Sequence, residues 1–237
     1  MLYNAIETLL LLPCITWEVW IKRRRRRDHP LMVSCICMNK RKIWNIVVFL
    51  IVTINWLRMV FFTSKTMLTA RGLGSLRYFT VLSNLFEGVA CLLWLHNRNE
   101  KVKYAAAVSV TLTFVVVIAF LGPLFGYRAM FSGVSFWMHL IVPLASLYEV
   151  LFMNREHFDL RDNILAAFPM GMYGIYYLGN NLINGSGEWP YMSDWYGFLR
   201  WGYPIGVLFY LGILLVTYLI GWCIRKEKER ISFGSKR

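Results

Sequence analysis

The chain has 237 residues, of which 57% are hydrophobic and 16% are charged, and its net charge is +13. A soluble domain carries roughly 25% charged residues, so the composition and the long apolar runs exclude an ordinary soluble protein and predict a polytopic α-helical membrane protein. The basic residues cluster beside the apolar runs, which is typical of cytoplasmic anchoring at anionic lipid headgroups, and we expect no nucleic-acid partner.

Residues 1–37 form a basic N-terminal extension. Its apolar core, 8–17, is too short to span a bilayer, and the basic run follows this core, the reverse of the order in a signal peptide. An interfacial helix is one interpretation, and a seventh span is a less favoured one. The favoured one is a start assigned too early, because Met38 begins MNKRKIWNIVVFL, which reads like a natural start that leads directly into a span.

Six apolar segments of about 18–21 residues follow, each long enough to cross a bilayer. They are 44–62, 76–95, 104–122, 134–153, 163–183 and 205–224. Short connections predict that sequential neighbours run antiparallel. We therefore predict an all-α transmembrane bundle of six helices within a membrane domain, 38–225, followed by a charged cytoplasmic tail, 226–237.

The distribution of basic residues orients this bundle. Twenty Lys and Arg lie in 22–42, 96–103, 154–162 and 225–237, whereas five lie in the alternate connections. The positive-inside rule then places both termini in the cytoplasm of a multi-pass cell-membrane protein. Under this topology the second and fourth spans both begin at the outer side.

The second span carries a polar stripe. Thr80, Ser83, Asn84 and Glu87 are spaced i, i+3, i+4 and i+7, so they share one helical face. Ionisable groups inside a bilayer are costly, by about 2.5–3.5 kcal/mol at its centre, so the stripe needs a partner or a function. Arg58 in the first span is one candidate partner for Glu87.

The fourth span carries His139 at a matching depth. Thr80 lies about 6 Å and His139 about 7–8 Å below the outer ends of their spans, at 1.5 Å per residue. Pro143 follows His139 by one turn, and a proline there frees a backbone carbonyl and can kink the helix beside a cavity. We expect that cavity between the second, fourth and fifth spans.

These residues suit nucleophilic chemistry. A Thr hydroxyl becomes a nucleophile when a base takes its proton, and a neutral imidazole is such a base. Ser83, Asn84, Glu87, Asn180 and Asn181 are the candidate substrate-binding positions, with the amides able to donate to an oxyanion. The five cysteines show no metal-ligand spacing, and the chemistry requires no metal or cofactor.

Plainer interpretations stay open. Thr in a transmembrane helix commonly bonds its own backbone or bridges helices, and a membrane His commonly satisfies a polar neighbour. The stripe could also form a path for a proton or polar solute through Glu87, which makes a transporter the alternative function, and a non-catalytic lipid-binding protein is a third.

The segment RYFTVLSNLF, followed two spans later by WMHLIVPLASLYEVLF, resembles the six-span family of the androgen-induced and androgen-dependent TFPI-regulating proteins, and most closely its prokaryotic branch. The resemblance covers about residues 40–225. It implies an intramembrane hydrolase of fatty acid esters of hydroxy fatty acids that uses one Thr and one His, at the matching positions Thr80 and His139. The predicted function is therefore hydrolysis of a membrane lipid ester.

Overall fold

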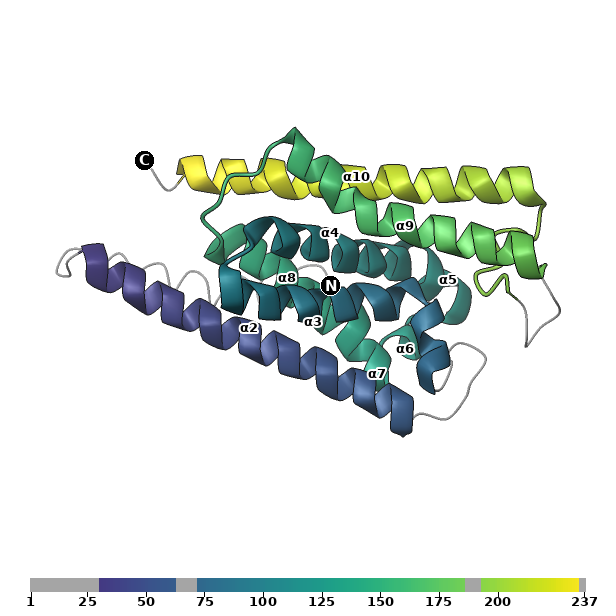
Figure 1. The fold of residues 1–237 in the computed structure, drawn as a ribbon, viewed down its shortest axis with the longest axis horizontal. Helices are drawn as coiled ribbons and strands as arrows, with labels where there is room; N and C mark the ends of the chain where they lie inside the picture. The colour runs from purple at the N-terminus through teal and green to yellow at the C-terminus, as the bar shows by residue number, and fades with distance from the viewer. Residues whose placement is uncertain (1–29, 63–71, 186–192, 235–237) are drawn as a thin grey trace. The chain divides into compact units, whose positions relative to one another are not determined.

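The computed structural model describes residues 30–62, 72–185 and 193–234, and every element in these ranges is helical (Figure 1). The predicted interfacial segment 8–17 and the arginine run 22–27 lie outside the described residues. The α-helices are α2 Pro30–Phe61, α3 Phe79–Asn97, α4 Glu100–Val116, α5 Gly122–Phe125, α6 Tyr127–Met130, α7 Gly133–Phe136, α8 Val142–Tyr148, α9 Leu160–Asn184 and α10 Tyr203–Gly234. A 3₁₀ helix, η1 Gly72–Arg77, precedes α3, and three π-helical stretches, η2 Val117–Leu121, η3 Trp137–Ile141 and η4 Glu149–Met153, interrupt the longer helices.

Five helical segments are long and apolar enough to cross a membrane. They are Lys40–Phe61, Phe79–Asn97, Glu100–Phe125, Gly133–Met153 and Tyr203–Ile231. Each overlaps a predicted span, so the all-α class is confirmed for the described residues and the chain is compatible with a multi-pass membrane protein. The predicted span 163–183 is helix α9, whose polar residues leave it outside this group. A sixth crossing and the sidedness of the termini stay predictions.

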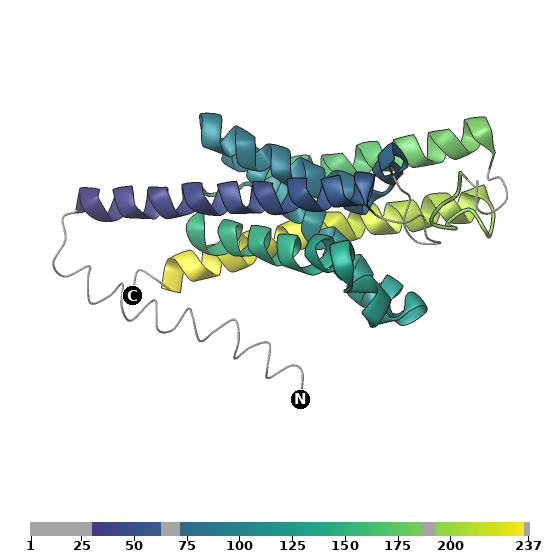
Figure 2. The same ribbon diagram turned by 90° about the horizontal axis from the view of Figure 1, so that it is seen from below.

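The chain divides into two units, Met1–Ile43 and Trp44–Arg237, and α2 runs from the first into the second. Within the second unit α4 is the central helix, in contact with α3, α8, α9 and α10 (Figures 1 and 2). Its sequence explains this position. Residues 104–110, YAAAVSV, are buried all round the helix, and small residues let neighbouring backbones approach closely.

Helices α9 and α10 meet through two glycines. A Cβ atom added at Gly174 would lie 1.6 Å from the Tyr210 ring, and one added at Gly221 would lie 2.2 Å from the Asn163 side-chain oxygen. The Tyr104 hydroxyl lies 2.9 Å from that same oxygen and 2.7 Å from the Gly221 carbonyl. The Tyr104 contacts join α4, α9 and α10 beside Gly221, and the Gly174–Tyr210 contact joins α9 and α10 at a second level, 11 residues further along α9.

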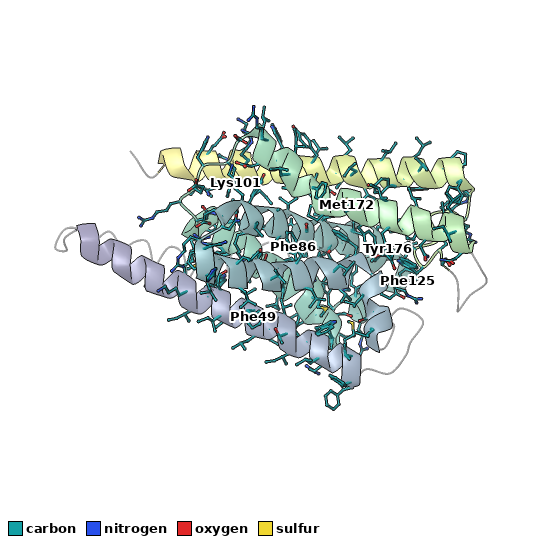
Figure 3. The ribbon with its side chains drawn as sticks, in the orientation of Figure 1. Phe49, Phe86, Lys101, Phe125, Met172 and Tyr176 are labelled. Carbon is teal, nitrogen blue, oxygen red and sulfur yellow. The ribbon has the colours of Figure 1, made fainter. Side chains whose placement is uncertain are left out.

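Charged side chains also join the helix ends. Lys101 of α4, labelled in Figure 3, pairs with Asp162 of α9 at 2.7 Å. Helix α10 continues beyond the predicted span into the charged tail, where Lys228 donates to the Asn154 side chain at 2.8 Å and lies 4.3 Å from the centre of the Phe158 ring. The first part of the predicted tail is therefore helical and packed.

Candidate functional site

The polar stripe on α3 is divided among different neighbours. The Ser83 hydroxyl lies 3.0 Å from the Thr113 hydroxyl of α4. The Asn84 amide donates to the Thr80 carbonyl at 2.7 Å and to the Met138 carbonyl of η3 at 3.1 Å. Ser83 and the NH₂ group of Asn84 therefore hold α3 against two other segments.

Thr80 differs from the rest of the stripe. It lies in the first turn of α3 and is half-buried, whereas Ser83, Asn84 and Glu87 are fully buried. Its carbonyl accepts from Asn84, but no described residue forms a hydrogen bond with its hydroxyl. The predicted nucleophile is thus the one stripe residue whose side chain is uncommitted.

His139 lies within the π-helical stretch η3, a distortion that is frequent at functional sites. Its Nδ1 atom lies 2.8 Å from the Met130 carbonyl of α6, so Nδ1 carries the proton as donor and Nε2 is left as an acceptor. This is the tautomer that a general base at Nε2 requires. The predicted base is therefore oriented by a fixed backbone partner.

Pro143 explains why Asn84 reaches η3. In the π-helical stretch the Val142 amide donates to the Trp137 carbonyl, five residues back. The next donor in that pattern would be residue 143, which is a proline without an N–H, so the Met138 carbonyl receives no helix hydrogen bond from it. Asn84 supplies the missing donor. The predicted release of a carbonyl by Pro143 is found, and its new partner is a stripe residue.

The same arrangement occurs at the end of the preceding span. There the Gly122 amide donates to the Val117 carbonyl across η2, and Pro123 follows. The Ile118 carbonyl, which Pro123 leaves without a donor, accepts the Tyr127 hydroxyl at 2.9 Å. In both places a proline follows a π-helical stretch, and a side chain donates to the carbonyl that the proline leaves free.

The structure brings the segments of Thr80 and His139 together without joining their side chains. Asn84 contacts the carbonyl of Thr80 and the carbonyl of Met138, the residue before His139. Among the described residues no hydrogen bond links the Thr80 hydroxyl to the His139 ring. Catalytic hydrogen bonds are often long or misaligned before substrate binds, so this geometry leaves the pair as a prediction.

Glu87 belongs to a separate, fully buried ion cluster. The Lys103 ammonium of α4 contacts both the Glu87 carboxylate and, at 3.0 Å, the Glu149 carboxylate of η4, and all three side chains are 0% exposed. Asn45 of α2 donates to Glu149 at 2.7 Å, and the Cys91 thiol lies 3.3 Å from the Lys103 nitrogen. The cluster lies about 10 Å along α3 from Thr80, seven residues at 1.5 Å each.

Two expectations from the sequence are corrected here. Glu87 is paired with Lys103, so the suggested pairing with Arg58 is not needed to neutralise it. Lys103 is a buried residue of α4, because the helix begins at Glu100, and it is not a loop charge at the membrane surface. Lys103 and Glu149 are the polar residues that the sequence interpretation missed. The signal was present, since an acid at 149 also lies inside an apolar run.

The two candidate asparagines on α9 have different surroundings. Asn181 is buried and donates to the Tyr177 carbonyl of its own helix at 2.8 Å. Asn180 accepts from Asn184 at 2.9 Å and lines a polar pocket of about 350 Å³. The pocket is lined by Leu73, Gly74, Leu76, Arg77, Tyr176, Asn180, Ser193 and Trp195. None of these residues comes from the fourth predicted span, so this pocket differs from the cavity expected between three spans.

An aromatic cluster lies beside this pocket and includes Tyr176, which is labelled in Figure 3. Its members are Tyr173, Tyr176, Tyr177, Trp195, Tyr196 and Phe198. The Tyr196 hydroxyl accepts the Phe79 amide at 2.8 Å and so satisfies the first free N–H of α3, which has no side-chain N-cap. Burial raises the pKa of Tyr196 to about 12, so this hydroxyl stays neutral near pH 7. The segment between α9 and α10 therefore caps the helix that carries Thr80.

A second, almost wholly apolar groove of about 600 Å³ lies between α4 and α10. Its lining comprises Leu112, Val115, Val116, Ala119, Phe120, Ile205, Leu208, Phe209, Gly212, Ile213 and Val216.

Among the described residues no group of three His, Cys, Asp or Glu side chains is arranged to hold a metal ion. Comparisons with protein-family models, curated proteins and solved structures find no match for this chain.

Proposed function

We propose that this protein is an integral membrane hydrolase of lipid esters, with Thr80 as nucleophile and His139 as general base. The observation that carries the proposal is the contrast within the polar stripe. Ser83, Asn84 and Glu87 are committed to neighbouring segments, whereas the half-buried Thr80 hydroxyl has no partner among the described residues. Asn84 in addition ties the Thr80 carbonyl to the segment that carries His139.

The reaction would proceed in two steps. The Thr80 oxygen forms a bond to the acyl carbon while its proton passes to Nε2 of His139, and the same proton then goes to the departing alcohol as the ester bond breaks. Water next attacks the acyl-threonine, with His139 again taking and returning the proton. Both amide hydrogens of Asn84 are used by backbone carbonyls, so in this proposal Asn84 positions the two segments.

The test is active-site labelling of the purified protein with a fluorophosphonate probe, followed by turnover of a long-chain ester. Thr80→Ala should abolish both, Thr80→Ser should retain labelling, and His139→Ala should abolish turnover. Thr217→Ala is the matched control, because the Thr217 hydroxyl donates to the Ile213 carbonyl of its own helix at 2.8 Å. Labelling that survives Thr80→Ala unchanged would remove Thr80 as the nucleophile.

Transport is the second candidate, and the buried Glu87–Lys103–Glu149 cluster favours it, since ionisable residues inside a membrane commonly mark ion or proton pathways. Liposome flux separates the two functions. Flux that depends on Glu87 and is indifferent to Thr80 would establish transport, whereas ester turnover that survives Glu87→Gln and is lost in Thr80→Ala would establish hydrolysis.

We further propose that α9 is a sixth crossing and that the resemblance to the six-span hydrolase family reflects kinship. Helix α9 has 25 residues, about 37 Å at 1.5 Å per residue, and its outward positions Ile164, Phe168, Met172 and Ile175 are apolar and exposed. Reporter fusions after residues 157 and 197 should then lie on opposite sides of the cell membrane. Both reporters on one side would remove the sixth crossing and the shared cytoplasmic location of the termini. With this topology we also propose that the basic termini bind anionic lipid headgroups.

A further inference from the structure

The polar pocket beside the start of α3 contains an arginine without an acid. Arg77 lines this pocket, and no described carboxylate pairs with it. The described segments at this end, 72–80, 122–136, 178–185 and 193–204, contain one acid, Asp194. Asp194 is already committed, because one of its carboxylate oxygens accepts the Tyr177 hydroxyl and the other accepts the Leu199 amide at 3.0 Å. No carboxylate of these described segments is therefore available to neutralise the charge of Arg77.

The hydrogen bonds of the guanidinium are only partly satisfied within the described chain. One terminal nitrogen donates to the Tyr78 hydroxyl at 2.9 Å, while the buried Nε atom has no hydrogen-bond partner in the described chain. The Asn180 side-chain oxygen accepts from the Asn184 side chain, which leaves the Asn180 side-chain nitrogen as a second donor in the same lining. Donors without acceptors suit a ligand that supplies only acceptor oxygens.

The walls of the pocket are fixed before any ligand arrives. The Tyr173 hydroxyl donates to the Arg77 carbonyl at 2.7 Å and accepts from the Trp195 indole at 3.0 Å, so one side chain holds two opposite parts of the lining. The guanidinium carbon lies 5.0 Å from the centre of the Tyr78 ring and 5.8 Å from that of Trp195. Such stacking restrains the plane of the guanidinium, and pre-organised donors lose less entropy when an anion binds.

We propose that this pocket binds an oxyanion, a carboxylate or phosphate group, through the Arg77 guanidinium. Its volume of about 350 Å³ accommodates a carboxylate or phosphate headgroup. The site does not depend on ester hydrolysis by Thr80. It is equally open to a soluble anion, and the chemistry of recognition is the same.

Binding should be measured on the full chain in a neutral detergent, with dodecanoate, dodecyl phosphate, dodecanol and inorganic phosphate as probes, by calorimetry and by the shift of the unfolding temperature. Dodecanoate and dodecyl phosphate should bind, and dodecanol should not compete. Arg77→Gln should weaken binding about tenfold or more, since a charge-assisted hydrogen bond is lost. Arg77→Lys should recover part of the affinity, because it restores charge without the planar fork.

Arg200→Gln is the matched control, because Arg200 is an exposed arginine that lies over the Trp201 ring at the same end of the chain. It should leave binding within about twofold, well under the tenfold step that one such hydrogen bond makes. Inorganic phosphate that binds alone with the same dependence on Arg77 would assign the site to a soluble anion, and binding by the amphiphiles alone would assign it to a lipid. Equal losses in the Arg77 and Arg200 variants, or undiminished binding in both Arg77 variants, would overturn the proposal.

Discussion

The side-chain amide of Asn84 donates to the main-chain carbonyl of Met138 across 3.1 Å, between two helices that are 54 residues apart in sequence. This carbonyl needs an outside donor because Pro143 cannot supply one. Both groups are buried, so water cannot replace the bond. Pro143 and Asn84 therefore act together to set the position of η3 against α3, and with it the position of His139.

Asn84→Ala should destabilise the protein by about 1–3 kcal/mol, the cost of leaving a buried carbonyl without a partner. In a Pro143→Ala background the helix regains a backbone donor, so the same Asn84→Ala change should cost less. A double-mutant cycle on denaturant or thermal unfolding measures the difference, and we expect a coupling of about 0.5 kcal/mol or more.

Tyr127→Phe provides the comparison for this cycle, because it removes the equivalent bond to the Ile118 carbonyl at an exposed position. Pro123 frees that carbonyl as Pro143 frees the Met138 carbonyl, so the cost should be similar, about 1–3 kcal/mol. Strict additivity of the Asn84 and Pro143 changes would show that the freed carbonyl is not what Asn84 serves.

Lys103→Met should destabilise the fold by about 3–5 kcal/mol or prevent folding, because it leaves two buried carboxylates without their shared ammonium. Adding Glu87→Gln to Lys103→Met removes one of those charges and should recover part of the lost stability, because Glu149 remains buried. Gel filtration in detergent and thermal unfolding report the outcome. A Lys103→Met protein as stable as the parent would mean that the ion cluster contributes nothing to the fold.

The apolar runs were sufficient to predict the helices. Every predicted span overlaps a helix of the described chain, because a run of about 20 apolar residues has few other structures available to it in lipid. Helix α9 is not among the five segments that are long and apolar enough to cross a membrane. Asn163, Tyr173, Tyr177 and Asn181 are buried, whereas Ile164, Phe168, Met172 and Ile175 are exposed, and average hydropathy does not separate these two sets.

The partners of the polar residues could not be predicted in the same way. Spacing places Ser83, Asn84 and Glu87 on one face, but it does not say that this face meets Thr113 and Lys103 of α4 and Met138 of η3. Those contacts depend on where α4 begins and on the π-helical stretches, which shift the register of every residue that follows. The sequence predicted that Pro143 frees a carbonyl. The three-dimensional structure was needed to show that this carbonyl accepts a hydrogen bond from Asn84.

Gly174→Ala should destabilise the contact between α9 and α10 by about 1–3 kcal/mol, because the new methyl group would overlap the Tyr210 ring, which is itself held by a 2.8 Å hydrogen bond to the Gly171 carbonyl. Gly179→Ala on the same helix meets nothing within 4 Å and should be neutral or stabilising by up to about 1 kcal/mol. Thermal unfolding of the two variants side by side checks the packing. Tyr210→Leu should recover much of the Gly174→Ala loss, and a failure to do so would place the strain elsewhere.

The start of α9 should be sensitive to acid through Asp159. Its side chain accepts the Asp162 amide at 2.8 Å and the Asp162 side chain accepts the Asp159 amide at 3.0 Å, which together form a capping box. The hydrogen bond from the Asp162 backbone lowers the pKa of Asp159. A carboxyl whose pKa is lower in the folded than in the unfolded chain adds stability at pH values above its unfolded pKa, about 3.9 for Asp. It loses that contribution as the pH falls through its folded pKa.

Asp159→Asn keeps a neutral cap and should make this contribution independent of pH, so the difference in unfolding temperature between parent and variant should shrink below about pH 4. Asp159→Ala should lower stability at neutral pH as well. A parent and an Asn variant with identical pH profiles down to about pH 3 would show that the folded chain does not shift this carboxyl.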